Sequence, residues 1–179
     1  MDEISYTRLW LARAGFAILL IGILFFQLLP LETTPRRFAG PDLILGFAFA
    51  WALRRPEYAP IGLTAALFLL ADLLLGRPPG LYAALGLIAF ASLRSRATSL
   101  RDMPFTVEWV TVTITLSVLM ITYRLVLALT LVPVPPLGLA ASQLALTVAA
   151  YPAVAAITRY VFGLRPVGIG EVNALGQRQ

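Results

Sequence analysis

The sequence predicts an all-α, polytopic membrane protein with six transmembrane helices. The first observation is composition: 59% of the 179 residues are apolar and only 13% are charged. Soluble domains have about 45–50% apolar and about 25% charged residues. A domain of this size still exposes much of its surface, so such a surplus of apolar side chains cannot be hidden in one soluble core. The second observation is that the apolar residues fall into six segments separated by short loops rich in Pro, Gly and Arg.

Three of the segments are long enough to cross a bilayer as helices, which takes about 20 apolar residues. The first, 9–31, is too long for the core of a signal peptide and no small-x-small cleavage site follows it directly, so we interpret it as a retained span. The fifth is 105–132. Its stretch 109–116 alternates like a strand, but the whole run is too long and too continuously apolar for a barrel strand. The sixth, 137–164, contains Pro152, which should kink it.

The three middle segments, 38–53, 60–75 and 79–93, are shorter. One interpretation is three compact spans that thin the bilayer or pack inside a bundle. The other is a re-entrant pair of helices, in which non-spanning backbone is buried by the rest of the protein. We favour three short spans, which gives six in total.

The distribution of arginine predicts the orientation. All 14 basic residues are Arg, and with six spans ten of them fall on the side of the two termini, against three on the opposite side. Because positive charge favours the cytoplasmic side, both termini are expected in the cytoplasm. We therefore expect a six-helix membrane domain over 1–165 and a short cytoplasmic tail over 166–179.

Several classes of chemistry are disfavoured by what the sequence lacks. There is no Cys and no His, which removes disulfides, thiolate and imidazole metal ligands, and Ser-His catalysis. The sequence also has no H-E-x-x-H, G-x-S-x-G or Gly-rich phosphate-binding motif. The Gly-Arg-Pro-Pro-Gly segment at 76–80 is rich in Gly and Pro, but we interpret it as a tight turn between helices. The arginines are scattered, which does not favour nucleic-acid binding. We expect no enzyme activity, no cofactor, no metal site and no nucleic-acid partner.

Ionisable residues inside spans are candidates for function because burying them in lipid is costly unless they are paired. We predict that Asp42, Asp72 and Arg124 face the bundle interior near the outer surface, with Arg124 paired to at least one of the two carboxylates. Glu108 instead falls near the cytoplasmic start of the fifth span. The favoured interpretation of the outer group is a structural lock that orients helices. The alternative is an outward-facing pocket for a ligand, a lipid head group or a partner segment.

Small residues recur every four positions in the sixth segment, which lets helix backbones approach closely. We favour internal packing for this ladder, with docking of a partner's helix as the alternative. Its members are Ala141, Ala145, Ala149 and Ala153. Trp51, close to two arginines, has the pattern of an interfacial anchor.

Two stretches together resemble a known family. They are PDLILGFAFAWALRRPE at 41–57 and ADLLLGRPPGLYAALGLI at 71–88. Their order and spacing, with the six predicted spans and the short termini, resemble MreD, the rod shape-determining membrane protein of bacteria. The positions that match the family pattern are Asp42, Asp72, Gly76, Pro78 and Gly80.

The resemblance implies a multi-pass protein of the bacterial inner membrane, in the machinery that builds lateral peptidoglycan. Proteins of this family associate with MreC, a single-span protein, in a wider complex with RodA, a class B penicillin-binding protein and the MreB filament. They have no known catalytic activity, and their fold is similar to the S components of energy-coupling-factor transporters. The expected function is a non-enzymatic scaffold. The alternative is an S-component-like module that binds or transports a small molecule or a lipid intermediate.

Overall fold

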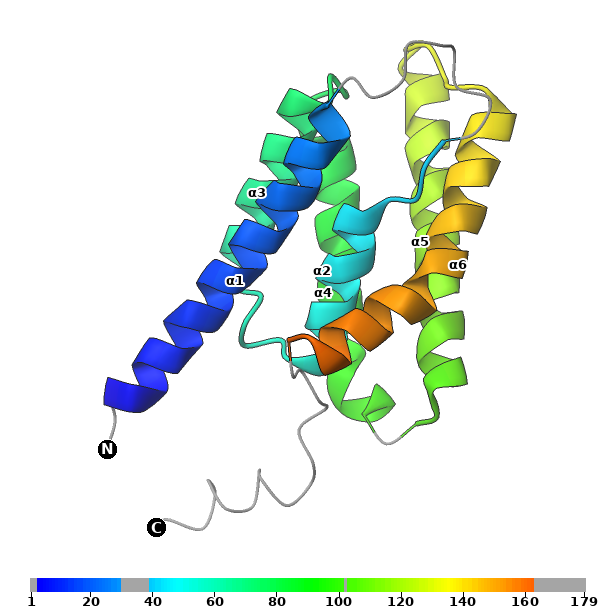
Figure 1. The fold of residues 1–179 in the computed structure, drawn as a ribbon. Helices are drawn as coiled ribbons and strands as arrows, with labels where there is room; N and C mark the ends of the chain where they lie inside the picture. Colours follow the sequence, from blue (N-terminus) through cyan, green and yellow to red (C-terminus); the bar gives the residue numbers. More distant parts are fainter. Residues whose placement is uncertain (1–2, 30–38, 102, 163–179) are drawn as a thin grey trace.

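The structure is a computed structural model that describes residues 3–29, 39–101 and 103–162 (Figure 1). These residues form six α-helices and no strand, which confirms the predicted all-α fold. The predicted tail, 166–179, lies outside the described residues. The helices are α1 (Glu3–Leu28), α2 (Leu43–Arg54), α3 (Ile61–Leu74), α4 (Leu81–Leu100), α5 (Phe105–Leu129) and α6 (Leu137–Tyr160).

Successive helices run in alternating directions, so the starts of α1, α3 and α5 lie at the same end of the bundle as the ends of α2, α4 and α6 (Figure 1). The helix α2 is central and packs against α1, α4 and α6, whereas α4 packs against α2, α3 and α5. We call the end that holds the start of α1 the lower end, and the opposite one the upper end, as in Figure 1.

Small side chains bring the inner helices close together. Every residue of α2 from Ile44 to Arg54 is buried, including three alanines and a glycine that leave room for its neighbours. At Gly86 of α4, an added Cβ would lie 3.1 Å from the ring of Phe68 on α3. That distance is tighter than an ordinary contact, so a larger residue at this position would require the Phe68 ring to shift by a few tenths of an ångström.

Three helices are long and apolar enough to cross a membrane: α1 from Tyr6 to Leu28, α5 and α6. Each also exposes large apolar side chains on its outer side, for example Ile18 of α1 (70% exposed), Leu125 of α5 (58%) and Leu146 of α6 (42%). The 12-residue α2 and the 14-residue α3 are shorter, about 18 and 21 Å long. These features indicate a membrane protein with at least three helices suited to span it, and six crossings remain a prediction.

The stretch of α5 that alternates like a strand is helical, as expected from the length of its apolar run. Its hydroxyl groups donate to carbonyl oxygens four residues earlier, for example Thr111 to Val107 at 2.7 Å and Thr115 to Thr111 at 2.8 Å. These bonds satisfy the polar side chains within the helix itself, so they can face an apolar surrounding. Helix α6, which contains Pro152, changes direction along its length as predicted (Figure 1).

Two packing predictions were wrong. The α6 ladder Ala141, Ala145, Ala149 and Ala153 is exposed rather than packed internally. The buried face of α6 instead includes Thr147 and Tyr151, each two positions from Ala149 and therefore about 200° round the helix from it.

The prediction for Trp51 fails for a related reason. It is only 2% exposed and lies in the core, with its ring 5.2 Å from that of Phe16 on α1. It does not anchor the chain at an interface, because α2 is enclosed by the helices around it. Sequence spacing identified an apolar helix here, but not which neighbours cover it.

Candidate functional site

Asp42 begins α2 and connects it to α6. One carboxylate oxygen, Oδ1, accepts a hydrogen bond from the backbone N–H of Leu45 at 3.1 Å, which caps the first turn of α2. The backbone N–H of Asp42 donates to Thr147 Oγ1 on α6 at 2.8 Å. Asp42 is 5% exposed. The side chain and the backbone of this aspartate are therefore each held by a hydrogen bond.

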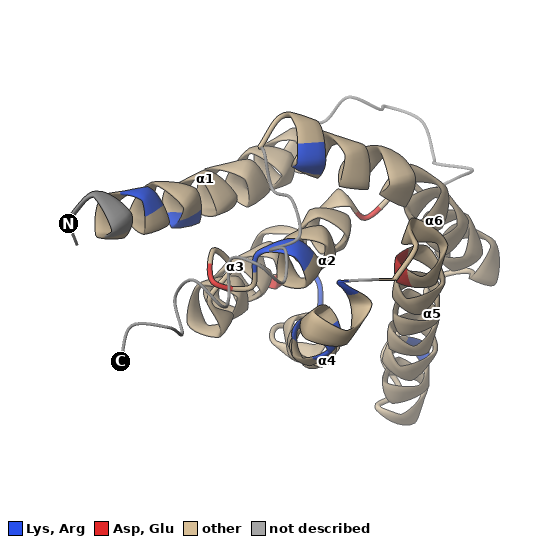
Figure 2. Cartoon of the chain, turned by 90° about the horizontal axis from the view of Figure 1, so that it is seen from below, with Lys and Arg blue, Asp and Glu red and all other residues tan. Residues whose placement is uncertain are grey.

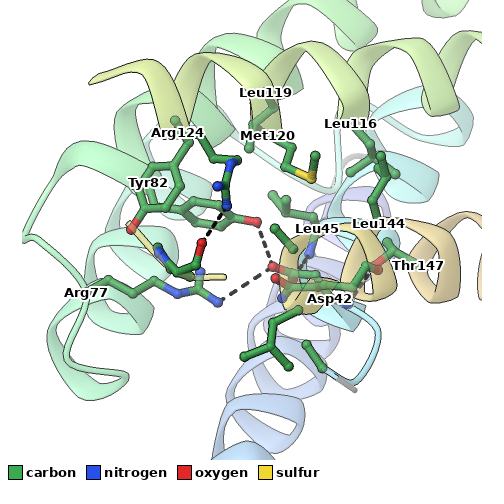
Figure 3. A pocket seen from close by; sticks show the side chains of 16 residues that line it. Asp42, Leu45, Arg77, Tyr82, Leu116, Leu119, Met120, Arg124, Leu144 and Thr147 are labelled. Carbon is green, nitrogen blue, oxygen red and sulfur yellow. Dashed lines mark hydrogen bonds and ion pairs between the residues drawn. The ribbon is translucent and has the colours of Figure 1, made fainter. Parts of the chain in front are cut away.

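The second carboxylate oxygen of Asp42 meets residues from the other family-like stretch (Figure 3). Oδ2 accepts a hydrogen bond from the hydroxyl of Tyr82 at 2.8 Å and lies 3.8 Å from Nη2 of Arg77. The Arg77 guanidinium sits over the Tyr82 ring, 4.2 Å from its centre. Burial lowers the pKa of Arg77, but the nearby carboxylates of Asp42 and Asp72 favour its charged form, and the balance raises its pKa. We call Asp42, Arg77 and Tyr82 the upper network.

Asp72 connects α3 to the start of α4 rather than α2 to its neighbours. It is fully buried near the end of α3, and its Oδ2 accepts a hydrogen bond from the backbone N–H of Ala83 at 2.8 Å. It thus supplies the capping acceptor that the first turn of α4 lacks from its own N-cap residue, Gly80. Its other oxygen has no hydrogen-bond partner among the described residues. Asp72 locks α3 to α4, which agrees with the structural interpretation.

The predicted tight turn between α3 and α4 is present. Gly76 and Gly80 have φ angles of +64° and +85°, in the left-handed region that favours glycine. Pro78 lies between them. The turn carries Arg77 to Asp42 and places Tyr82 in the first turn of α4, so the two glycines shape the upper network through the backbone.

Next to the upper network is a cavity of about 290 Å³ between α2, α4, α5 and α6, which we call the upper pocket (Figure 3). This volume is near the lower limit of small-molecule sites. The apolar part of the wall includes Leu116, Leu119, Met120 and Leu144. The polar part comprises Asp42, Arg77, Tyr82, Tyr123, Arg124, Gln143 and Thr147. Asp42 and Arg124 therefore share one site as predicted, whereas Asp72 does not line it.

The predicted ion pair of Arg124 is wrong. Its Nη1 donates to the backbone carbonyl of Pro135 at 2.8 Å, and it forms no ion pair with Asp42 or Asp72. The oxygens of Asp42 are occupied by Leu45, Tyr82 and Arg77, so Arg77 takes the predicted role.

Sequence reasoning missed Arg77 and Tyr82 because the Gly-Arg-Pro-Pro-Gly segment was interpreted only as a turn. The available signal was that this turn and Asp42 were predicted at the same face of the membrane. A loop arginine beside two glycines can fold back over the helix ends, and here it does so.

Glu108 lies at the lower end, as predicted, in a separate cluster. Its Oε1 is 3.1 Å from Arg54 Nη2 and accepts a hydrogen bond from the hydroxyl of Tyr151 at 2.7 Å. The cluster ties together α2, α5 and α6. The bundle thus has one polar group at each end and an apolar middle.

The upper pocket has the character of a binding site. Its two guanidinium groups, one carboxylate and two phenol side chains can bind an anionic or hydrogen-bonding group, and its apolar wall can hold a hydrocarbon part. No group of three or more His, Cys, Asp or Glu suited to a metal ion occurs among the described residues. Comparison with family models, with curated proteins and with solved structures found no match for the chain.

Proposed function

We propose that this protein is a non-enzymatic scaffold of the bacterial inner membrane that binds MreC and supports lateral peptidoglycan synthesis and cell shape. RodA, a class B penicillin-binding protein and MreB would be its partners in the wider complex. The observation that carries the proposal is the convergence of the two family-like stretches: Asp42 from the first contacts Arg77 and Tyr82 from the second. The two stretches that carry the resemblance are thus in direct contact with each other.

The surroundings of that unit suit a protein partner. The exposed alanine ladder of α6 begins at Ala141, two residues before Gln143 of the upper pocket. Small residues on an exposed face of an apolar helix allow the backbone of a second helix to approach closely. A single-span partner such as MreC would pack on this ladder, and its adjoining segment would reach the upper pocket.

Co-purification with MreC in mild detergent tests the proposal. We expect removal of residues 166–179 to leave the yield of the complex unchanged, whereas Arg124→Leu and Ala149→Leu lower it. Asp72→Leu should lower it too, but Asp72 caps α4, so its circular dichroism must first match that of the wild type. The control is Ser95→Ala, an exposed serine bonded only to its own helix. Normal MreC yield with folded Arg124→Leu and Ala149→Leu variants would contradict the scaffold proposal.

The cavity itself favours a second candidate, an S-component-like module that binds a small molecule or a lipid intermediate in the upper pocket. This candidate predicts that a soluble ligand or a lipid raises the unfolding temperature with the dependence ln(1 + [L]/Kd). Arg124→Leu would abolish that rise while leaving MreC recovery unchanged. A ligand screen on the purified protein, with MreC recovery measured in parallel, distinguishes the two candidates.

A further inference from the structure

A second cavity, of about 150 Å³, lies at the lower end of the bundle, and we call it the lower cavity. It is formed where α2, α4 and α6 end and α5 begins. Three of its lining residues are arginines, Arg54, Arg101 and Arg159, and one is an acid, Glu108. Figure 2 views the chain from this end and shows basic positions on several helices among few acidic ones.

The one carboxylate in the wall is already engaged. Glu108 pairs with Arg54 and accepts the hydrogen bond from Tyr151. It forms no ion pair with Arg101, the residue after α4, or with Arg159 in the last turn of α6. Among the described lining residues, the charge in excess is positive.

Arg54 points to a missing acceptor. Its side chain is only 7% exposed, yet Nη1 has no hydrogen-bond partner among the described residues. A buried donor on a charged group is costly when it has no acceptor, so such groups are nearly always satisfied in folded proteins. A ligand oxygen in the lower cavity would supply an acceptor beside this side chain.

The start of α5 adds a third feature. Its N-cap residue is Pro104, which provides no side-chain acceptor. The N–H of Val107 donates to the Pro104 carbonyl at 2.9 Å, whereas the N–H groups of Phe105 and Thr106 have no hydrogen-bond partner among the described residues. Phe105, the first residue of this 25-residue helix, lines the cavity. The positive end of the helix dipole and these N–H groups favour an anion at the same place as the arginines.

We propose that the lower cavity binds a phosphate group, either that of an anionic phospholipid head group or free phosphate. Guanidinium groups bind phosphate oxygens through paired hydrogen bonds, which suits a site lined by three arginines. The remaining wall is apolar, with Leu53 and Met103 among its residues, and fits the glycerol and first methylene groups of a lipid. The site is distinct from the upper pocket, so this proposal does not depend on MreC binding.

Native mass spectrometry and thermal unfolding of the purified full chain test the proposal in two arms. One arm adds inorganic phosphate in neutral detergent. The other uses nanodiscs of phosphatidylcholine with and without phosphatidylglycerol. The variant is Arg101→Gln with Arg159→Gln, which removes two lining guanidiniums and leaves the Arg54–Glu108 pair intact. The matched control is Arg8→Gln with Arg96→Gln, which removes the same charge from two exposed positions outside the cavity.

We expect saturable binding in at least one arm, weakened about tenfold or more in the cavity variant and unchanged in the control. Binding in the phosphate arm would identify free phosphate as sufficient. Binding only with phosphatidylglycerol would identify the lipid head group. Equal loss in both double variants would mean unspecific charge attraction and overturn the proposal, as would the absence of saturable binding in both arms.

Discussion

Replacing Asp42 by alanine tests the upper network at its centre. The substitution removes the cap of α2, which costs about 1 kcal/mol. It also leaves the Tyr82 hydroxyl, now 2.8 Å from the carboxylate, without its acceptor, at about 1–3 kcal/mol. The ion pair with Arg77 adds at most about 1 kcal/mol, because its atoms are 3.8 Å apart and Arg77 is 23% exposed. The backbone bond to Thr147 survives, since it uses the N–H group.

We therefore expect Asp42→Ala to lower the free energy of unfolding by about 2–5 kcal/mol. Asp42→Asn keeps Oδ1 for the cap and should cost about 1 kcal/mol. Reversible unfolding in mixed detergent micelles, followed by the fluorescence of the three tryptophans, measures both. Ser95→Ala, on the exposed surface, is the control. A free energy for Asp42→Ala within about 0.5 kcal/mol of the wild type, or equal losses for Ala and Asn, would refute the reasoning.

Three further substitutions can be measured in the same unfolding assay. Thr147→Val should lower the free energy of unfolding by about 1–3 kcal/mol, because it leaves the buried N–H of Asp42 without an acceptor. Thr147→Ser keeps the accepting oxygen and should therefore be more stable than Thr147→Val. Equal stabilities of the two variants would contradict this explanation. Ala155→Leu, at a 4% exposed position, should lower the free energy of unfolding by about 1–3 kcal/mol. Ala149→Leu, at an exposed position, should leave it within about 0.5 kcal/mol of the wild-type value. The reverse order would mean that α6 packs with its other face. Gly80→Ala should lower the free energy of unfolding by about 1–2 kcal/mol, because its φ angle of +85° is strained for any residue with a Cβ. Steric overlap would not contribute, since nothing lies within 4 Å of the added carbon. An unchanged stability would exclude backbone strain at this position.

The sequence was sufficient for the helices because their signal is local. Apolar runs bounded by Pro, Gly and Arg predicted all six, and the long run of α5 correctly outweighed the strand-like alternation within it. Boundaries were less accurate: the second predicted segment, 38–53, corresponds to the helix Leu43–Arg54. The residue that starts this helix is the capping Asp42, so the cap, rather than hydropathy, determines where it begins.

Side-chain partners were harder to predict because they depend on how helices rotate against each other. Asp42 and Arg124 were placed in one site correctly, yet the ion pair formed with Arg77. The ladder that includes Ala149 was assigned to the packed face, although a rotation of about half a turn places Tyr151 there instead. Neither the rotation of α6 nor the fold of a short turn leaves a signal in hydropathy.

Single-cysteine labelling tests most directly whether the chain crosses a membrane with the upper network at its outer face. The native chain has no cysteine, so each introduced thiol is the only one. Leu131→Cys places it in the exposed upper loop between α5 and α6, where Leu131 is 93% exposed, and Met103→Cys places it at the lower end, where Met103 is 55% exposed. With a membrane-impermeant maleimide on intact cells, we expect labelling at position 131 and none at 103 until the cells are opened. Labelling at 103 but not 131, or at both in intact cells, would contradict it.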